Sequence, residues 1–392
     1  MKPARHFPAL LWLIVSAFLP LEAQPPGPPA TTKFIDVGGH KLRMLVAGSG
    51  APTVVLESGM GDGIESWSSV LPDVARFTRV VAYDRPGLGK SELGPTPGSF
   101  AGYATELHNM LQRAGISPPY VLVGHSLGAG YLRAFAYLYK NEVRGLVFVD
   151  PFNEQIFRSA STQEKDEQMT QADAQAAKGS AGNQAEWKVT QSEVLKDFPE
   201  LRTFGPPPDV PMALLIAGGR HEGVTGWQKA VLTEYGAWVA DASEGSLVLD
   251  PESGHYIQRD NPQLVVSAIR RVVFPSVERA LTRTIANKGV AAAIDSYRQM
   301  KKTYPAEYLR EATLNTLGYQ QLQAKHVDDA IALFKLNVEM YPKGFNTYDS
   351  LGEAYMAAGD RQAAIANYRK SLALNPENTN AVQMLTRLGV KP

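Results

Sequence analysis

The sequence predicts an α/β domain with a mainly parallel sheet covered by helices on both faces, followed by an all-α domain of helical repeats. Three observations predict this architecture. Short apolar segments alternate with helical segments from residue 33 to residue 275. One polar segment, residues 151–211, interrupts the alternation. From residue 276 onward the apolar strand-like segments stop, and similar residues recur every 34 positions.

The composition limits the classes of protein that this chain can represent. Its 392 residues include 39 Lys and Arg, 39 Asp and Glu, and no Cys. Balanced charge disfavours a nucleic-acid-binding protein, which needs a basic surplus to neutralise phosphates. The lack of cysteine excludes disulfides, a cysteine nucleophile and thiolate metal sites. With 44% hydrophobic residues, the chain can bury a substantial core.

Residues 1–23 have the order of a secretory signal peptide. Lys2 and Arg5 precede an apolar run at residues 9–19, and Ala23 supplies a small residue for cleavage. The run is shorter than the ~20 residues of a spanning helix, which disfavours a membrane anchor. Residues 24–32 contain four prolines and are predicted to form an extended leader. We therefore expect an exported bacterial protein, periplasmic or extracellular, in keeping with the absence of thiols.

The segments of the first domain are assigned in order from their apolar patterns. A hairpin is expected first, with antiparallel strands at residues 33–37 and 41–47. Continuous apolar runs predict buried strands at residues 54–56, 79–83, 120–123, 146–149, 213–216 and 246–249. Helical spacing predicts helices at residues 67–77, 100–115, 127–140, 227–239 and 262–273. Strands of this kind indicate a parallel sheet buried on both faces, whose ligands bind at the carboxyl ends of the strands.

The polar segment 151–211 is too long for an ordinary connection between two core strands. It is rich in Gln, Ala and Glu and ends in Gly205 and three prolines. Loops of this length are uncommon and are usually functional. We therefore expect a small helical lid over the site, with an idle loop as the alternative.

Residues 124–128, which read Gly-His-Ser-Leu-Gly, carry the strongest chemical signal. They lie between a predicted strand and a predicted helix. A serine at such a junction sits on a sharp turn that flanking glycines permit, and its hydroxyl is exposed above the sheet. The positive end of the following helix faces the negative charge that develops when this hydroxyl attacks a carbonyl group. The segment therefore predicts that Ser126 is a nucleophile.

Together with two further motifs, this segment resembles the α/β-hydrolase family over about residues 33–274. The other motifs are the turn at residues 83–91, Tyr-Asp-Arg-Pro-Gly-x-Gly-x-Ser, and the late Ser-Gly-His at residues 253–255. The resemblance implies that Ser126 is the nucleophile and that His255, after the last strand, is the general base. It implies neither a metal nor a cofactor.

The resemblance also implies an oxyanion hole made by two backbone N–H groups. One belongs to Leu127, the residue after the nucleophile. The other belongs to the loop after the strand at residues 54–56, where many relatives carry His-Gly and this chain has Ser-Gly-Met-Gly. The N–H of Met60 is the candidate for this second donor. Asp84 and Arg85 are expected to form a structural turn pair.

The acid of the triad is left open among three carboxylates. Relatives commonly carry an aspartate where this chain has His221. Asp150 ends the preceding strand, which is the position that some members of the family use. Glu222 lies one residue beyond His221, and Asp250 is close to His255 in sequence. We favour Asp150, with Glu222 as the first alternative; a purely structural strand-end role for Asp150 stays open. The acid would orient the imidazole and stabilise its charged form.

The last part of the chain, residues 276–392, repeats with a period of 34. The matched pairs are Leu317-Gly318 with Leu351-Gly352, Ala330 with Ala364, Phe334 with Tyr368, and Pro342 with Pro376. This period resembles the tetratricopeptide repeat, and residues 292–305 fit the second helix of an earlier, degenerate unit. Because one helical hairpin cannot bury its apolar face alone, we expect docking on the first domain or on a second copy. A peptide-binding groove and a packing or dimerisation module are both open.

These features predict an exported serine hydrolase that cleaves a carboxylic ester through an acyl-enzyme on Ser126. A small amide is the next substrate class, and the same residues would support cofactor-free perhydrolysis. Haloalkane dehalogenase and epoxide hydrolase chemistry are disfavoured, because the resemblance implies an aspartate at the position of Ser126 in those relatives. The alternative from another class is a binding protein in which the repeats are the working part. The presence of both Ser126 and His255 disfavours this alternative.

Overall fold

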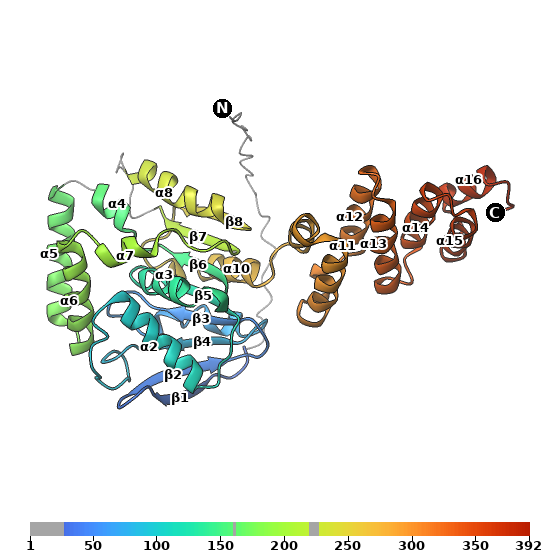
Figure 1. Cartoon of the computed structure of the whole chain (residues 1–392). Helices are drawn as coiled ribbons and strands as arrows, with labels where there is room; N and C mark the ends of the chain where they lie inside the picture. Colours follow the sequence, from blue (N-terminus) through green and yellow to red (C-terminus); the bar gives the residue numbers. More distant parts are fainter. Residues whose placement is uncertain (1–26, 160–161, 219–226) are drawn as a thin grey trace.

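The computed structural model describes residues 27–159, 162–218 and 227–392 (Figure 1). In this part of the chain, an eight-stranded sheet with flanking helices is followed by an array of helices that extends away from one side of the sheet. The predicted signal peptide, residues 1–23, and the first residues of the predicted leader lie outside the described residues.

The described strands form one sheet in the order β1–β2–β4–β3–β5–β6–β7–β8. Their bounds are β1 Thr31–Asp36, β2 Lys41–Ala47, β3 Thr53–Glu57, β4 Val80–Tyr83, β5 Tyr120–His125, β6 Val143–Val149, β7 Met212–Ala217 and β8 Gly245–Asp250. β2 pairs antiparallel with β1 and β4, and the other neighbours pair parallel. The predicted, mainly parallel sheet is therefore confirmed. The predicted leader, residues 24–32, extends too far by two residues, because Thr31 and Thr32 begin β1 and pair with Val46 and Leu45 of β2.

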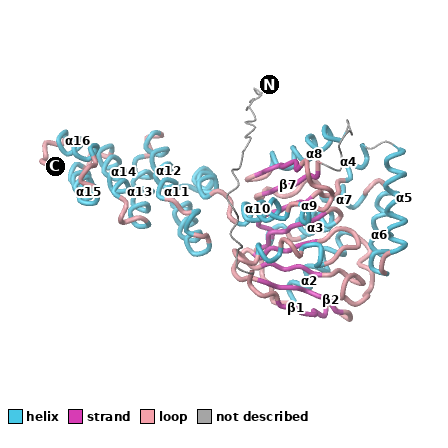
Figure 2. Tube along the Cα trace, turned by 180° about the vertical axis from the view of Figure 1, so that it is seen from behind, coloured by secondary structure: helices cyan, strands magenta, loops and turns pink. Residues whose placement is uncertain are grey.

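Helices cover both faces of the sheet, which explains why its central strands are mainly apolar. α2 (Phe100–Arg113), α3 (Gly128–Leu138) and α8 (Trp227–Asp241) pack on one face. α10 (Pro262–Val273) packs on the opposite face, which Figure 2 shows from behind. Successive side chains of a strand point to opposite faces. Both sets of side chains are therefore buried in β3, β4 and β5.

The helix predicted at residues 67–77 does not form as one element. The chain instead makes a 3₁₀ turn, η1 (Ile64–Trp67), and one turn of α-helix, α1 (Leu71–Val74). Pro72 has no backbone N–H, so a helix that continued from residue 67 would lose a hydrogen bond there. Proline is tolerated instead in the first turn of a new helix, where it lies in α1.

Between β6 and β7 the chain forms the predicted helical lid. Its helices are α4 (Glu154–Ser159), α5 (Thr162–Lys178), α6 (Ala181–Leu195) and α7 (Pro199–Phe204). α5 and α6 stand side by side at one edge of the domain (Figure 1). The indole N–H of Trp187 in α6 donates to Asp173 Oδ1 in α5 at 2.6 Å, so Trp187 joins the two lid helices.

The C-terminal helices pair as the 34-residue period predicts. They are α11 (Val277–Thr303), α12 (Glu311–Gln323), α13 (Val327–Met340), α14 (Phe345–Ala357), α15 (Arg361–Leu374) and α16 (Thr379–Arg387). A Cβ added at Gly318 would lie 2.5 Å from the Phe334 ring, and one at Gly352 would lie 2.9 Å from the Tyr368 ring. The matched pairs therefore mark the close crossing of two helices in each repeat. α11 is broken at Gly289, where φ is 83°.

The helical array packs on the first domain through an aromatic cluster. The Phe274 ring, just after α10, lies 5.3 Å from the Tyr304 ring and 5.1 Å from the Tyr308 ring, measured between centroids. Arg144 at the start of β6 donates to the Tyr304 hydroxyl at 3.4 Å. Of the two docking expectations, contact with the first domain is therefore present. None of the helices in the described ranges has the length and apolar character that a membrane span requires.

Candidate active site

Ser126 lies on the sharp turn between β5 and α3. Its φ of 50° is in the left-handed region, which is unfavourable for a residue with a side chain. The turn depends on its two glycines. A Cβ at Gly124 would lie 2.9 Å from Ala129 N, and one at Gly128 would lie 2.6 Å from Ser58 O. Backbone hydrogen bonds hold the turn, because Ser126 N–H donates to Val149 O at 3.1 Å.

The structure brings Ser126, His255 and Asp150 into one hydrogen-bonded chain. Ser126 Oγ lies 3.0 Å from His255 Nε2, and His255 Nδ1 lies 2.6 Å from Asp150 Oδ2. Asp150 Oδ1 also accepts from the backbone N–H of Ala217 at 3.0 Å, which fixes the carboxylate. Ser126 and Asp150 directly follow β5 and β6, and His255 lies in the loop after β8. This geometry can pass the serine proton to the imidazole and stabilise the resulting positive charge.

Of the other two candidate acids, Asp250 holds the loop rather than the imidazole. Its Oδ2 accepts from Ser253 Oγ at 2.7 Å and from Asn261 Nδ2 at 2.9 Å. These bonds support the backbone that carries His255. Glu222, like the neighbouring His221, lies outside the described residues. Among the described carboxylates, Asp150 is therefore the one that the structure places on His255 Nδ1.

The loop after β3, residues 58–62, packs directly against the serine turn. A Cβ at Gly59 would lie 3.3 Å from Ser126 Cβ and 2.8 Å from His125 Nδ1, so this approach requires glycine. Two N–H groups of the loop are already bound: Gly61 N–H donates to Glu186 Oε2 at 2.9 Å, and Asp62 N–H donates to Gly59 O at 3.2 Å. The predicted oxyanion donors, Met60 and Leu127, thus belong to the two segments that meet at Ser126.

A buried arginine holds the carbonyl groups of this loop. Arg85, which is 1% exposed, donates to Ser58 O at 2.8 Å and to Gly59 O at 2.6 Å. It also forms ion pairs with Glu57 and with Glu186 of the lid. Burial alone would lower the pKa of Arg85, but Glu186 and Glu57 raise that pKa well above its usual value. Arg85 therefore stays charged and does more than the turn pairing expected for it.

Asp84 does have the structural role that its turn predicts. Its carboxylate accepts from the backbone N–H groups of Ile64 at 2.8 Å and Lys90 at 3.0 Å. Arg43 donates to the same carboxylate at 3.3 Å. Asp84 therefore shapes the turn, while the neighbouring Arg85 reaches the loop beside Ser126.

His125, the second residue of the Gly-x-Ser-x-Gly segment, supports the loop of the candidate base. Its Nε2 lies 2.8 Å from His255 O, and its ring lies 4.6 Å from the His255 ring between centroids. Burial, followed by the nearby His255, lowers the pKa of His125 to about 3. The ring is therefore neutral near pH 7, and Nε2 carries the proton that it donates to the carbonyl.

Three buried residues around the site were not predicted from the sequence, and their sequence contexts differ. Glu57 could have been singled out, because it is a charged residue at the end of an apolar strand. His125 occupies the variable position of its motif, which indicates no role. Glu186 stands in a lid with many charged side chains, and no spacing relates it to Arg85, from which it is separated by 101 positions.

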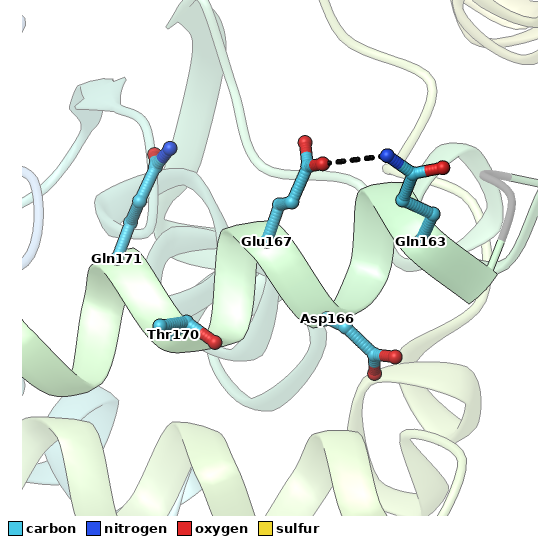
Figure 3. Close-up of a pocket in the computed structure, with 5 residues that line it drawn as sticks. All are labelled: Gln163, Asp166, Glu167, Thr170 and Gln171. Atoms are coloured by element: carbon cyan, nitrogen blue, oxygen red, sulfur yellow. Dashed lines mark hydrogen bonds between the residues drawn. The ribbon is translucent and has the colours of Figure 1, made fainter.

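One hollow of the molecule lies on the lid and away from the candidate site. Figure 3 shows its polar side chains along α5, where Gln163 Nε2 donates to Glu167 Oε1 at 2.9 Å. The lining residues are Gln163, Asp166, Glu167, Thr170 and Gln171. None of them comes from the strand ends that carry Ser126 and Asp150, so this hollow does not belong to the candidate site.

Comparison with known proteins agrees with this architecture. Residues 52–192 match the family model of the alpha/beta hydrolase fold, and residues 345–378 match that of the tetratricopeptide repeat. The uncharacterized protein YqjL of Bacillus subtilis is 26% identical over 236 residues, which are 59% of this chain and 88% of YqjL. The 2-hydroxy-6-oxo-6-(2'-aminophenyl)hexa-2,4-dienoic acid hydrolase of Metapseudomonas resinovorans is 30% identical over 120 residues, covering 30% of this chain and 41% of that enzyme.

Solved structures resemble the first domain in fold. The epoxide hydrolase CorEH is 18% identical, with a TM-score of 0.48, and the match covers 62% of this chain and 98% of CorEH. Such identity concerns the fold and not the reaction. The family models and the sheet topology agree on the two parts of the molecule. The chain therefore consists of an α/β-hydrolase domain followed by a tetratricopeptide-repeat region.

Proposed function

We propose that the protein is a serine hydrolase that cleaves a carboxylic ester through an acyl-enzyme on Ser126. The observation that carries the proposal is the continuous hydrogen-bonded chain from Ser126 Oγ through His255 to Asp150. Nucleophile and base lie within hydrogen-bond reach, and a third group orients the base, which is the arrangement that nucleophilic acyl transfer requires.

The reaction follows from this geometry. His255 Nε2 takes the proton of Ser126 Oγ as the oxygen attacks the carbonyl carbon, and Asp150 stabilises the imidazolium. The N–H groups of Leu127 and Met60 bind the oxyanion of the tetrahedral intermediate. The intermediate collapses, the alcohol leaves with the proton from His255, and the acyl group stays on Ser126. Water, deprotonated by His255, then releases the carboxylic acid and restores the serine hydroxyl.

The surroundings of Ser126 favour an ester with an apolar group. Phe152, which closely follows the candidate acid in sequence, adjoins the serine turn, because its N–H donates to Ser126 O at 3.0 Å. Its ring lies 6.1 Å from the Phe157 ring and 5.7 Å from the Phe198 ring. Met60 is a partly buried member of the same apolar cluster. These side chains support an apolar acyl or alcohol group rather than a charged one.

Active-site labelling tests the proposal. A fluorophosphonate probe should label the wild-type protein and fail to label Ser126→Ala. A series of p-nitrophenyl esters of increasing chain length, with aminoacyl naphthylamides and peracid formation as parallel assays, should give the highest kcat/KM with an ester. If an amide gave the highest turnover, the proposed substrate class would be an amide. If peracid formation dominated, the proposed activity would be perhydrolysis. Absence of labelling of folded protein would favour a scaffold whose repeats are the working part.

We also propose that the protein is exported and that its repeats contact another protein or peptide. The support for export is the order of basic, apolar and small residues in residues 1–23. The support for a partner is the helical array that extends away from the hydrolase domain (Figure 1). The mature N-terminus should lie near Gln24, and Met1 found intact on exported material would contradict export by a cleaved signal.

A further inference from the structure

We propose that Glu186 of the lid is a positioning residue that orients the oxyanion donor of Met60. This inference rests on the proposed function and assigns a role in it to a lid residue. Glu186 lies in α6 and is fully buried. It reaches the loop after β3 in two ways, directly through Gly61 N–H and indirectly through Arg85.

The two peptide units on either side of Met60 are both fixed by this pair. A peptide unit is planar and trans, so its C=O and N–H point in opposite directions. Gly59 O accepts from Arg85 Nη2 at 2.6 Å, which directs the N–H of Met60 away from Arg85. Gly61 N–H donates to Glu186 Oε2 at 2.9 Å, which directs the carbonyl of Met60 away from Glu186. The direction of the proposed donor is therefore set by Arg85 and Glu186 together.

Glu186 also determines where the Arg85 guanidinium lies. Its carboxylate pairs with Arg85 through Nε and Nη2, with Nη2 3.2 Å from Oε2. Arg85 Nη1 pairs separately with Glu57 Oε1 at 2.5 Å. Without the Glu186 carboxylate, Glu57 still neutralises the guanidinium, so the buried charge keeps a partner. The orientation of the loop is then lost without leaving an unpaired buried cation.

The same helix offers a matched control. Glu193 is also buried in α6, but its carboxylate accepts from the N–H groups of Glu200 and Leu201 at 3.0 and 3.4 Å, at the start of α7. Within the described part of the chain, these hydrogen bonds direct Glu193 to α7 rather than to the loop after β3. A Glu193→Gln substitution therefore perturbs the lid in the same helix and leaves the Met60 loop in place.

Glu186→Gln tests the inference. In the carboxylate, Oε1 accepts from Arg85 Nε and Oε2 accepts from Gly61 N–H. The new amide has one acceptor oxygen and carries N–H groups on its other side, so it cannot keep both of these bonds. On a p-nitrophenyl ester, kcat should fall about 10- to 100-fold with little change in KM, because oxyanion binding acts in the transition state. The Ki of a trifluoromethyl ketone, whose adduct carries an oxyanion, should rise by the same factor. Glu193→Gln should lower the thermal midpoint without changing kcat or this Ki.

The outcomes separate the inference from the proposed function. Wild-type kcat and wild-type Ki in folded Glu186→Gln would overturn the inference and leave the proposed serine hydrolase intact. Parallel losses in both Glu186→Gln and Glu193→Gln would also overturn it, since they would report lid damage. If Glu186→Gln does not fold, the triple variant Arg85→Met, Glu186→Leu and Glu57→Gln removes the three charges of this buried cluster together, so that no buried ion is left without a partner. It must show the same fall in kcat. Failure of the fluorophosphonate to label wild type would overturn both proposals.

Discussion

At the scale of single residues, the motif predicted the serine turn, whereas the acid could only be ranked, with Asp150 favoured over Glu222 and Asp250 by the family resemblance. Close contacts with neighbouring backbone atoms require glycine at positions 124 and 128. The two glycines of the motif therefore predict the sharp turn that carries Ser126. No local spacing relates either Asp150 or Asp250 to the imidazole of His255, so the ranking depended on the strand-end position of Asp150. Asp250 is close to His255 in sequence, but its carboxylate accepts hydrogen bonds from Ser253 and Asn261. Asp150, which is 105 positions from His255, is hydrogen-bonded to the imidazole ring.

The two aspartates give a direct test of the acid. Asp150→Asn should lower kcat on an activated ester by about 10³- to 10⁴-fold, because the amide favours the wrong imidazole tautomer. Asp250→Asn should lower the thermal midpoint and reduce kcat by less than about tenfold, since it supports only the loop. Steady-state kinetics of both variants and of Glu222→Gln decide between the carboxylates. A larger loss with either alternative than with Asp150→Asn would reject Asp150.

His125 predicts a specific dependence of stability on pH. Its pKa is lowered to about 3 in the folded chain by burial and by His255, against about 6.5 for an exposed imidazole. Between these values the unfolded chain binds a proton that the folded chain does not, so this contribution to stability is lost as pH falls from about 6.5 toward 3.

The contribution can be isolated with a variant that does not titrate. Between pH 7 and pH 5, the free energy of unfolding of the wild type should fall by about 2 kcal/mol more than that of His125→Gln. Urea denaturation at the two pH values measures both proteins. Equal pH dependence of the two proteins would show that His125 is not held neutral in the folded state.

At the scale of elements, the strands follow from their apolar runs, and the lid follows from the interrupted pattern. The lid's attachment could not be predicted, because ion pairs such as Arg85–Glu186 and Arg133–Glu154 join distant parts of the chain and have no local pattern. The helix prediction at residues 67–77 failed for a local reason: the apolar spacing is helical, but Pro72 divides the segment.

The first lid helix is fastened by a buried ion pair whose loss should be costly. Arg133 in α3 binds Glu154 in α4 through two hydrogen bonds, at 2.5 and 2.9 Å, and also donates to Leu201 O at 3.1 Å. Glu154→Gln leaves a buried guanidinium without its counter-ion and should destabilise the protein by roughly 3–5 kcal/mol.

Two exposed ion pairs that share Asp197 in the same region are the control. Asp197 pairs with Arg158 and Arg202 at 2.8 and 3.0 Å, with all three side chains substantially exposed. Asp197→Asn should therefore cost no more than about 1 kcal/mol. Urea denaturation of both variants makes the comparison, and a similar small loss in each would contradict the fastening role of Arg133–Glu154.

At the scale of the whole molecule, the repeats and the hydrolase domain share one apolar core. A single cluster of buried side chains runs from the central strands through α10 to α11, α12 and α13. Phe274 and Tyr304 lie at the junction, in contact with each other. The 34-residue period predicted the repeats but could not distinguish docking here from docking on another copy, because both bury the same apolar face.

This shared core predicts that the two parts unfold together. Tyr304→Ala removes a ring that is 8% exposed, together with its hydroxyl, which accepts from Arg144. Calorimetry should show one transition for the wild type and a lower midpoint for the variant, with a loss of about 3–5 kcal/mol. Phe345→Ala, at an aromatic ring of the repeats that is 38% exposed, should lower the midpoint much less. Two separate transitions in the wild type would contradict a shared core.

The proposed reaction depends on a covalent bond that forms at one hydroxyl. Mixing the protein with p-nitrophenyl butyrate, quenching within the burst and digesting it should place the butyryl group on the peptide that contains Ser126. The same treatment of His255→Ala should leave that peptide unmodified. Two results would contradict an acyl-enzyme on Ser126. In one, the butyryl group is found on another residue; in the other, the ester is turned over but no butyrylated peptide is found during the burst of nitrophenol release.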